Sequence, residues 1–343
     1  RKNFEIHAFS LNSNKKDEFN KRIRVGVDYF HDVQMMSDRD IVMLSRSLEI
    51  DIAIDLTGFT ENCRLGIFAM SAAPIQVGYL GYAGTMGANY MNYLIADKTI
   101  IPERNKKYYL ENIIYLPCYQ VNDTKIKLSK KIFSRKDFGL PINGFVFCCF
   151  NSHYKINPNI FSQWMKILSQ VDKSVLWLPA GKSTVINNLK KEAKKNNINE
   201  NRLIFAPILP LKEDHMRRIQ LADLFLDTLP FNAHTTASDA LRMGVPILTC
   251  KGESFPSRIA ASLLKAVNLP ELITTTLEQY ESLAIDLAKN PKKLKIIKDK
   301  LINNLPTAPL FNTLLFTQNL ESAYKIIYEN YQNRFNLNDI KIN

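Results

Sequence analysis

Residues 202–250, RLIFAPILPLKEDHMRRIQLADLFLDTLPFNAHTTASDALRMGVPILTC, decide the fold. Short apolar runs alternate in this stretch with segments whose apolar residues recur at helical spacing. The predicted elements are strands at 202–207, 224–227 and 246–250, and helices at 212–222 and 235–243. Strands that are apolar along their whole length and alternate with helices are typical of a parallel sheet that helices cover on both faces.

The same alternation continues on both sides of this stretch. Further strands are predicted at 145–150, 174–178 and 272–275, and further helices at 158–169, 183–196, 255–266 and 277–289. The tail from 293 to 331 reads as two helices, which Pro306 and Pro309 separate. In this α/β architecture ligands bind beyond the carboxyl ends of the strands, so functional residues are expected at the strand-to-helix junctions.

The first part of the chain carries weaker signals. The predicted elements are a helix at 37–48 that starts at Ser37, a strand at 50–56, a helix at 63–71 and a strand at 75–80. Four of the 12 glycines fall in residues 78–87 (GYLGYAGTMG), which indicates a loop that needs close backbone approach or positive φ. Because the chain opens with Arg1 inside a short apolar segment, we expect it to be a fragment.

Length and local composition indicate two lobes. The chain has 343 residues, and a domain typically has roughly 150. Residues 101–139 are irregular and rich in Lys, Asn and Pro, so the connection between the lobes is expected at 139–143. The predicted domains are an N-terminal lobe at 1–139, a C-terminal lobe at 140–306, and a C-terminal helix at 307–335 that packs back on the first lobe.

Composition argues against several classes of function. The net charge of +12 comes largely from lysines in helical runs such as 190–195 and 292–300, which read as solvated helix faces and not as a nucleic-acid surface. No apolar run is long enough to span a membrane, and the first twenty residues do not resemble a signal peptide, so a cytoplasmic protein is expected. The five cysteines include no C-x-x-C pair, and neither a disulfide framework nor a zinc site is indicated.

Two junctions carry residues suited to phosphate. Lys155 follows the strand at 145–150, where it could hold a phosphate or could be an ordinary exposed lysine. His234, Thr235 and Thr236 lead directly into the helix at 235–243, where free N–H groups, two hydroxyls and the helix dipole make an anion site, unless a threonine is only a helix cap.

Three further residues are candidates for contacts to a sugar or a base. Asp239, one turn into the same helix, could accept hydrogen bonds from sugar hydroxyls or only favour the helix dipole. Lys212 and His215 are three residues apart and share a helix face, although His215 could be an ordinary half-buried histidine. No pair of histidines has the spacing of a metal site, and no Walker A, dinucleotide, G-x-S-x-G or kinase motif is present. The residues alone therefore predict a metal-free diphosphate site in a parallel-sheet lobe.

Distinctive motifs lie along most of the chain. They are IDLTGFT, RLGIFA, APIQVGYLGYAGTMG and MNYLIAD in the first half, and FNSHYKINP, SVLWLPA, the stretch at 202–249, SRIAASLL and PLFNT in the second half. In order and spacing these motifs resemble those of the O-GlcNAc transferase/SPINDLY family. The resemblance implies two Rossmann-like lobes in the glycosyltransferase B arrangement, with inverting, metal-independent sugar transfer from a nucleotide diphosphate to Ser or Thr of proteins. It also implies that the opening strand of the first lobe, an Asp-Phe-x-x-His-Pro segment and tetratricopeptide repeats would precede Arg1.

The resemblance assigns roles residue by residue. It implies that Lys155 holds the donor diphosphate beside Tyr154, and that Thr235 and Thr236 start the phosphate-binding helix. Four residues would surround the uridine and its ribose: Lys212, His215, His234 and Asp239. Acceptor chemistry is less defined, because animal members have other residues at Ser152, His153 and Asp51.

His234 and Tyr154 also bear on the donor, since the SPINDLY branch, which resembles a GDP-fucose user, generally lacks both. They favour UDP-GlcNAc as the donor and a protein or peptide as the acceptor, with no cofactor. Two alternatives stay open: a GDP-fucose-dependent transferase of SPINDLY type, and an inactive fragment that only binds nucleotide sugars. RNA binding driven by the net charge is a third, weaker reading.

Overall fold

The computed structural model describes residues 3–11, 17–122 and 126–342 of the chain. The chain divides into two compact units. The first comprises Arg1–Ile95, Lys107–Ile114 and Tyr324–Ile340, and the second comprises Ala96–Lys106, Tyr115–Ala323 and Lys341–Asn343. These limits differ from the expected boundaries at 139 and 306.

The difference at 139 has a physical cause. Residues 115–122 and 126–139 belong with the second unit, and several of their side chains are bonded to it. Asn122 donates to Ser238 over 2.8 Å, and Arg135 forms an ion pair of 2.7 Å with Asp223. These partners lie about a hundred residues away in sequence, and composition alone gives no sign of such contacts.

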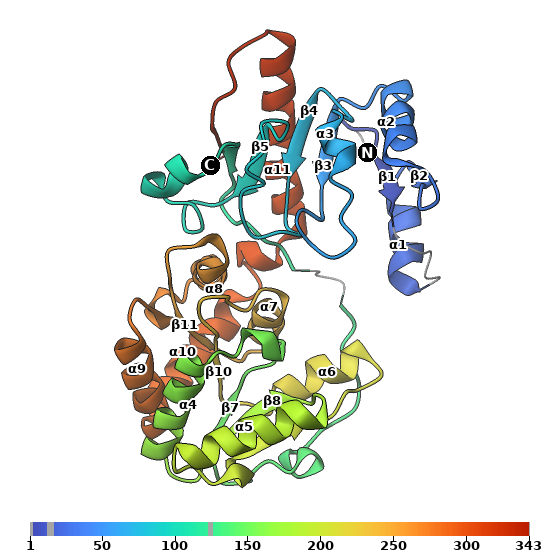
Figure 1. Ribbon diagram of the computed structural model, residues 1–343. Helices are drawn as coiled ribbons and strands as arrows, with labels where there is room; N and C mark the ends of the chain where they lie inside the picture. Colours follow the sequence, from blue (N-terminus) through green and yellow to red (C-terminus); the bar gives the residue numbers. More distant parts are fainter. Residues whose placement is uncertain (1–2, 12–16, 123–125, 343) are drawn as a thin grey trace. The chain divides into compact units, whose positions relative to one another are not determined.

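The second unit contains a six-stranded sheet whose strand pairs are parallel (Figure 1). Its strands are β7 (Val146–Cys148), β8 (Val175–Pro179), β9 (Leu203–Ala206), β10 (Leu224–Leu226), β11 (Ile247–Cys250) and β12 (Ile273–Thr274). All six were predicted from the apolar runs. The order β12-β11-β10-β7-β8-β9 is that of a doubly wound Rossmann sheet, in which the first strand in sequence, β7, pairs with the fourth, β10.

Helices alternate with these strands and follow the last of them, as the sequence predicts. The helices between strands are α4 (Pro158–Gln170), α5 (Ser183–Lys195), α6 (Lys212–Ile219), α7 (Thr235–Arg242) and α8 (Ile259–Ala266). Those after β12 are α9 (Leu277–Lys289), α10 (Pro291–Asn304) and α11 (Thr313–Gln332), and the part of α11 from Tyr324 onward belongs to the first unit. Local caps explain several starts: Asn157 accepts from the N–H of Ile160 ahead of α4, and Pro158 occupies its first turn. The helix predicted from 255 begins only at Ile259, after a short 3-10 turn that contains Pro256. Among the described helices, none has the length and hydropathy needed to cross a membrane.

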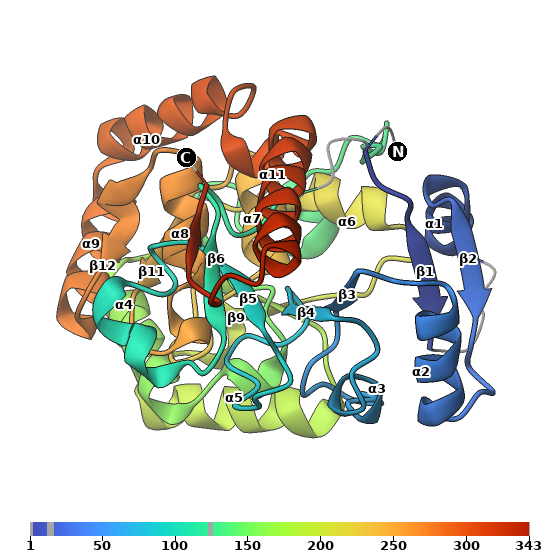
Figure 2. The same ribbon diagram turned by 90° about the horizontal axis from the view of Figure 1, so that it is seen from above.

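The first unit is built around a second sheet. Its order is β13-β6-β5-β4-β3, and a separate parallel pair, β1 and β2, lies beside it (Figure 2). The strands are β1 (His7–Ser10), β2 (Tyr29–Asp32), β3 (Ile52–Asp55), β4 (Ile75–Gly78), β5 (Tyr93–Ala96), β6 (Asn112–Tyr115) and β13 (Ile340–Lys341), and the helices are α1 (Glu18–Gly26), α2 (Asp38–Ser47) and α3 (Gly66–Ala69). The described residues of both units also contain short 3-10 helices, which are η1 (Glu103–Tyr108), η2 (Arg135–Phe138), η3 (His153–Lys155), η4 (Glu200–Arg202), η5 (Phe255–Ser257), η6 (Pro270–Leu272) and η7 (Pro309–Phe311).

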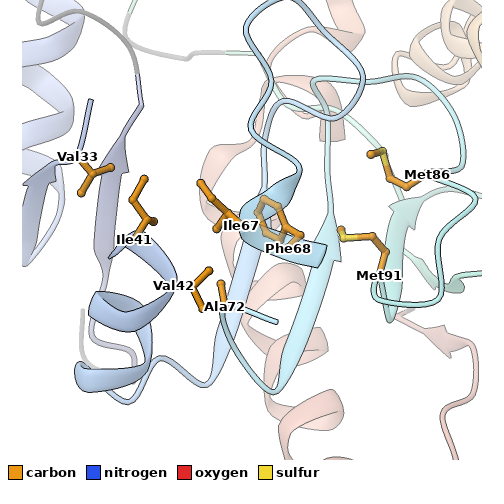
Figure 3. Close-up of a cluster of buried hydrophobic side chains, with 8 residues drawn as sticks. All are labelled: Val33, Ile41, Val42, Ile67, Phe68, Ala72, Met86 and Met91. Atoms are coloured by element: carbon orange, nitrogen blue, oxygen red, sulfur yellow. The ribbon is translucent and has the colours of Figure 1, made fainter. Parts of the chain in front are cut away.

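A cluster of buried apolar side chains holds α2 and α3 in the first unit (Figure 3). Its members are Val33, Ile41, Val42, Ile67, Phe68, Ala72, Met86 and Met91. The last two come from the Gly-rich loop and the segment after it. A Cβ atom on Gly81 would come within 2.1 Å of the Leu56 carbonyl oxygen, and Gly87 has a φ of +61°. Both features that the loop at 78–87 was expected to need, close backbone approach and positive φ, are therefore present.

Candidate functional site

The loops after β7 and β10 form one bonded group in the second unit. They follow the two central, adjacent strands at which the strand order reverses, and in doubly wound sheets ligands bind at this point. Asn151, after β7, donates to the hydroxyl of Thr228 over 2.8 Å and accepts from the hydroxyl of Thr236 over 2.7 Å. Lys155 Nζ donates to the Asn232 carbonyl over 2.8 Å. The two predicted phosphate junctions therefore lie side by side.

The N-terminus of α7 is open to an anion. His234 is its N-cap and has non-helical backbone angles, and its side chain makes no capping hydrogen bond. Thr235 is exposed and Thr236 is half-buried. With no side-chain cap, the first N–H groups and the dipole of the helix favour a negatively charged ligand there.

Both basic side chains at this junction have shifted pKa values. Burial lowers the pKa of Lys155, and the nearby Asp227 opposes that shift. Burial, with the Lys155 charge, lowers the pKa of His234 to about 3, so this imidazole is uncharged near neutral pH. Its Nε2 atom is buried and has no hydrogen-bond partner among the described residues. The site thus holds one fixed cation and one neutral ring.

Phe231 was not predicted, and its ring lies among the candidates. The Lys155 ammonium lies 4.3 Å from its ring centroid, and the His234 ring stacks on it at 5.1 Å. Tyr154 is 77% exposed and meets Phe231 edge-on at 6.4 Å. Nothing in the sequence marks Phe231 as a site residue, because an apolar residue in a loop is usually only a packing residue.

Asp227, also missed, organises the loop after β10. One carboxylate oxygen accepts from the N–H groups of Thr228 and Ala233, over 2.8 and 2.7 Å, and the other accepts from the Thr249 hydroxyl over 2.7 Å. Burial raises the pKa of Asp227 to about 7. The carboxylate that ends the apolar run LFLD was the available signal. Its position directly after a buried strand is typical of a side chain that orders a binding loop.

His215 is held on α6 by Arg218. The Nδ1 atom of His215 accepts from two guanidinium nitrogens of Arg218, at 3.1 and 2.9 Å, so a neutral ring carries its proton on Nε2. Burial, Arg218 and Lys212 lower the pKa of His215 to about 4. The ring also meets Phe150, next to the end of β7, at 5.4 Å. His215 therefore presents a donor near the switch point, while Lys212 is exposed.

Asp239 is fixed by a residue that the sequence did not single out. Asn122 donates to Asp239 over 3.2 Å and to Ser238 over 2.8 Å, and Arg242 donates to the Asn122 side-chain oxygen over 3.2 Å. Burial raises the pKa of Asp239. These bonds orient the Asp239 carboxylate on α7.

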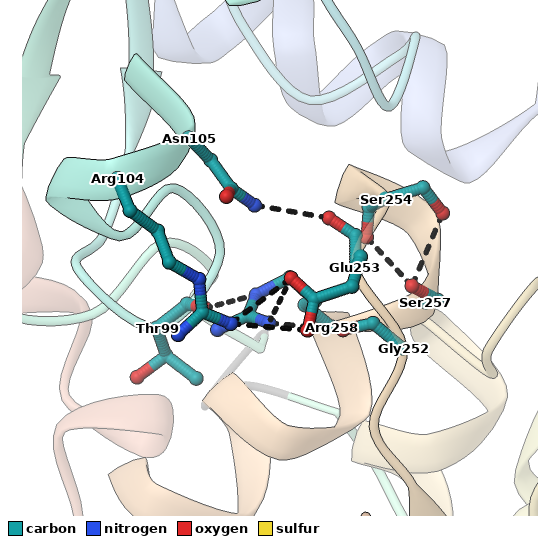
Figure 4. Close-up of polar contacts among 8 residues, drawn as sticks. All are labelled: Thr99, Arg104, Asn105, Gly252, Glu253, Ser254, Ser257 and Arg258. Atoms are coloured by element: carbon teal, nitrogen blue, oxygen red, sulfur yellow. Dashed lines mark hydrogen bonds and ion pairs between the residues drawn. The ribbon is translucent and has the colours of Figure 1, made fainter. Parts of the chain in front are cut away.

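A third loop at the same sheet edge, after β11, is held by a polar cluster (Figure 4). Buried Arg258 donates to the carbonyls of Thr99 and Gly252, over 2.7 and 2.9 Å. Arg104 donates to both carboxylate oxygens of Glu253 at 3.0 Å. All these residues belong with the second unit, so the cluster fixes this loop within it.

Three residues that bear on acceptor chemistry, Ser152, His153 and Asp51, make none of the contacts described above. His153 Nε2 lies 3.1 Å from the Pro179 carbonyl oxygen, and Ser152 is exposed. Asp51 is an exposed residue of the first unit. Within the described parts of the chain, no three His, Cys, Asp or Glu side chains gather as metal ligands would.

Comparisons with known proteins identify the family of the chain. The sequence matches glycosyl transferase family 41 over residues 1–130 and 122–320. It is 38% identical over 331 residues to the probable UDP-N-acetylglucosamine--peptide N-acetylglucosaminyltransferase SEC of Arabidopsis thaliana, covering 94% of this chain and 34% of the relative. It is 31% identical over 325 residues to the similarly described SPINDLY protein of Petunia hybrida, covering 92% and 34%. The chain thus spans about one third of the length of these relatives.

A solved structure supports the predicted fold. A mutant of the Thermobaculum terrenum O-GlcNAc transferase matches with a TM-score of 0.86 and 28% identity, over 95% of this chain and 62% of that one. The predicted fold class, α/β with two Rossmann-like lobes of the glycosyltransferase B kind, is confirmed. The chain belongs to glycosyl transferase family 41.

Proposed function

We propose that this chain is the catalytic region of an inverting glycosyltransferase that moves N-acetylglucosamine from UDP-GlcNAc to Ser or Thr hydroxyls of proteins, without a metal ion. One observation carries the proposal: Lys155 and the N-terminus of α7 lie together at the switch point of the second sheet. The SEC relative, described as a probable UDP-N-acetylglucosamine--peptide N-acetylglucosaminyltransferase, supports the same donor and acceptor.

The chemistry follows from the charges. The acceptor hydroxyl oxygen attacks the anomeric carbon and loses its proton to a base, while the bond from that carbon to the diphosphate breaks and the bonding electrons leave with UDP. Negative charge therefore grows on the departing diphosphate. Two groups stabilise this charge more in the transition state than in the ground state. One is Lys155 with Tyr154 beside it, and the other is the N-terminus of α7 with Thr235 and Thr236. They take the part that a metal ion plays in other transferases.

The other candidates bind the nucleoside. In this proposal four residues surround the uridine and ribose: Lys212, His215, His234 and Asp239. His215 offers an N–H donor and Asp239 a carboxylate acceptor, which suits carbonyl oxygens and hydroxyl groups, respectively. A GDP-fucose donor is the alternative that the presence of His234 and Tyr154 disfavours. The upstream tetratricopeptide repeats, the cytoplasmic location and the lack of nucleic-acid binding stay predictions.

The decisive variant is Lys155→Ala in the full-length protein. Transfer to a protein acceptor should be lost, because a contact to the leaving group contributes several kcal/mol in the transition state. The matched control is Lys182→Ala, which removes an exposed lysine at the next strand-to-helix junction, ahead of α5, and should keep activity. Full activity in Lys155→Ala would overturn the assignment of the diphosphate site.

Nucleotide binding tests the donor independently of transfer. UDP should raise the melting temperature by mass action, and EDTA should not change this rise. By titration calorimetry UDP should bind at least about tenfold more tightly than GDP, because a pocket shaped for one base leaves polar groups unpaired with the other. A magnesium requirement would contradict the metal-free site. Equal affinities, or a preference for GDP, would favour the SPINDLY-type donor.

A further inference from the structure

Phe231 contacts three of the residues that the proposed function uses. The ammonium of Lys155 lies over its ring at 4.3 Å, the His234 ring stacks nearly parallel to it at 23°, and the Tyr154 ring approaches edge-on. One aromatic ring therefore links the cation, the neutral imidazole and the exposed phenol of the site.

The backbone of Phe231 is itself fixed. Thr228 donates its hydroxyl to the Phe231 carbonyl over 2.6 Å, and Asn232 donates its amide to the Thr228 carbonyl over 2.8 Å. Asp227 binds the N–H groups at both ends of this loop, those of Thr228 and Ala233. The ring therefore stands on a rigid loop and can act as a fixed platform.

The ring suits Lys155 for an electrostatic reason. The face of an aromatic ring is negative and attracts an ammonium, but it is not an anion and does not neutralise the lysine as a carboxylate would. An ammonium has three N–H donors, and the structure uses one of them on the Asn232 carbonyl. The other donors can serve a phosphate while the ring keeps the charge in place.

We propose that Phe231 is a positioning residue of the donor site, whose ring holds the Lys155 ammonium and the His234 imidazole where the donor diphosphate departs. This inference rests on the proposed function. A charge that is already in place when the leaving group develops its own charge needs no reorganisation. Loss of the ring should therefore lower kcat more than it raises KM for the donor.

A graded substitution separates the electrostatics of the ring from its shape. Phenylalanines that carry one, two or three fluorine atoms, introduced at position 231 of the full-length protein, keep nearly the same volume while the negative face weakens. The transfer rate should fall stepwise along the series, by on the order of tenfold in all, given the range of cation–π energies. The transfer rate of the Phe231→Leu variant should fall by at least the same factor.

The matched control is the same fluorinated series at Phe161. This buried ring of α4 packs against Trp164, and no cation lies over it among the described residues. The series at Phe161 should leave kcat unchanged. Melting temperatures of all variants, with and without UDP, separate loss of folding from loss of positioning. A flat rate along the Phe231 series, with the protein folded, would overturn the inference.

UDP affinity in a Lys155→Met background distinguishes this inference from the proposed function. With Lys155 present, fluorination at Phe231 should weaken UDP binding; in Lys155→Met the same fluorination should have no further effect, because the cation is gone. If Lys155→Ala abolishes transfer while the Phe231 series is flat, only the inference fails. If Lys155→Ala retains transfer, the proposed function fails. If UDP affinity falls equally in both backgrounds, Phe231 acts without Lys155 and the inference is wrong.

Discussion

Two loops, one in each unit, begin on a buried aspartate at the carboxyl end of a strand. Asp227, after β10, has both carboxylate oxygens bonded. Asp55, the last residue of β3, uses one oxygen for the N–H groups of Thr57 and Gly58 and the Thr57 hydroxyl, while its other oxygen is buried without a partner among the described residues. The loop in the second unit is therefore complete by itself, whereas the loop in the first unit leaves a buried acceptor open.

The strands that carry these loops differ in the same way. All residues of β10 are buried, while three of the four residues of β3 are only half-buried. Parallel strands are stable when both faces are covered. The second unit thus presents its candidate site on a rigid support, which is what stabilisation of a developing charge requires.

The largest expected effect comes from removing each aspartate in turn. Asp227→Ala leaves two buried N–H groups and the Thr249 hydroxyl without an acceptor, and should lower the free energy of unfolding by about 3–5 kcal/mol. Asp55→Ala should cost only about 1–2 kcal/mol, because half-buried Thr57 can turn to water and an unpaired oxygen is removed as well.

Urea unfolding followed by tryptophan fluorescence and by circular dichroism measures both variants. The two tryptophans, Trp164 and Trp177, are buried in the second unit, so fluorescence reports on that unit. Equal losses for the two variants would show that the loops do not differ in the way the hydrogen bonds indicate.

A smaller effect is expected on how the free energy of unfolding depends on pH. Burial raises the pKa of Asp227 to about 7 from the ordinary value of 3.8 for an aspartate side chain. Between these values the folded protein holds a proton that the unfolded chain releases, so the contribution of Asp227 to stability falls as pH rises and levels off above about pH 7. Asp227→Asn keeps the shape without the titration. Relative to wild type, its free energy of unfolding should rise by about 1–3 kcal/mol between about pH 5 and pH 8.

Unfolding of both proteins in urea at several pH values gives this difference directly. A difference that stays constant with pH would mean that Asp227 is ionised throughout, with Lys155 and its hydrogen-bond donors outweighing burial.

The strands of the second unit could be predicted from the sequence, whereas several strands of the first unit could not. All six strands of the second unit are continuous apolar runs, and all were predicted. The pair β1 and β2 was missed because its strands contain His7 and His31 and are only partly buried, and the short apolar segment at the start of the chain was not assigned as a strand. The strands β5 and β6 were not assigned as strands either, and β6 lies within the stretch at 101–139 that reads as irregular.

For the site, residues at the junctions could be predicted because topology alone brings the carboxyl ends of the strands together. Lys155, His234 and Thr236 are of this kind. The supporting residues were missed because their contacts join distant parts of the chain: Asn122 and Asp239 are 117 residues apart in sequence. Patterns within a window of residues carry no information about such pairs.

The smallest expected effect tests whether the order of the second unit extends from the phosphate end of the site to the nucleoside end. Asn122→Ala removes the donor that orients Asp239, the residue proposed to accept from ribose hydroxyls. UDP affinity should fall by roughly threefold to tenfold, the worth of about one neutral hydrogen bond. The loss should be smaller for deoxyuridine diphosphate, which lacks one hydroxyl. Asn199→Ala, at the cap of η4, is the matched control and should leave both affinities unchanged. Equal losses for the two nucleotides would mean that Asn122 supports the fold of the loop at 115–122 and does not orient Asp239, and the nucleoside end of the site would then have to be assigned to other residues.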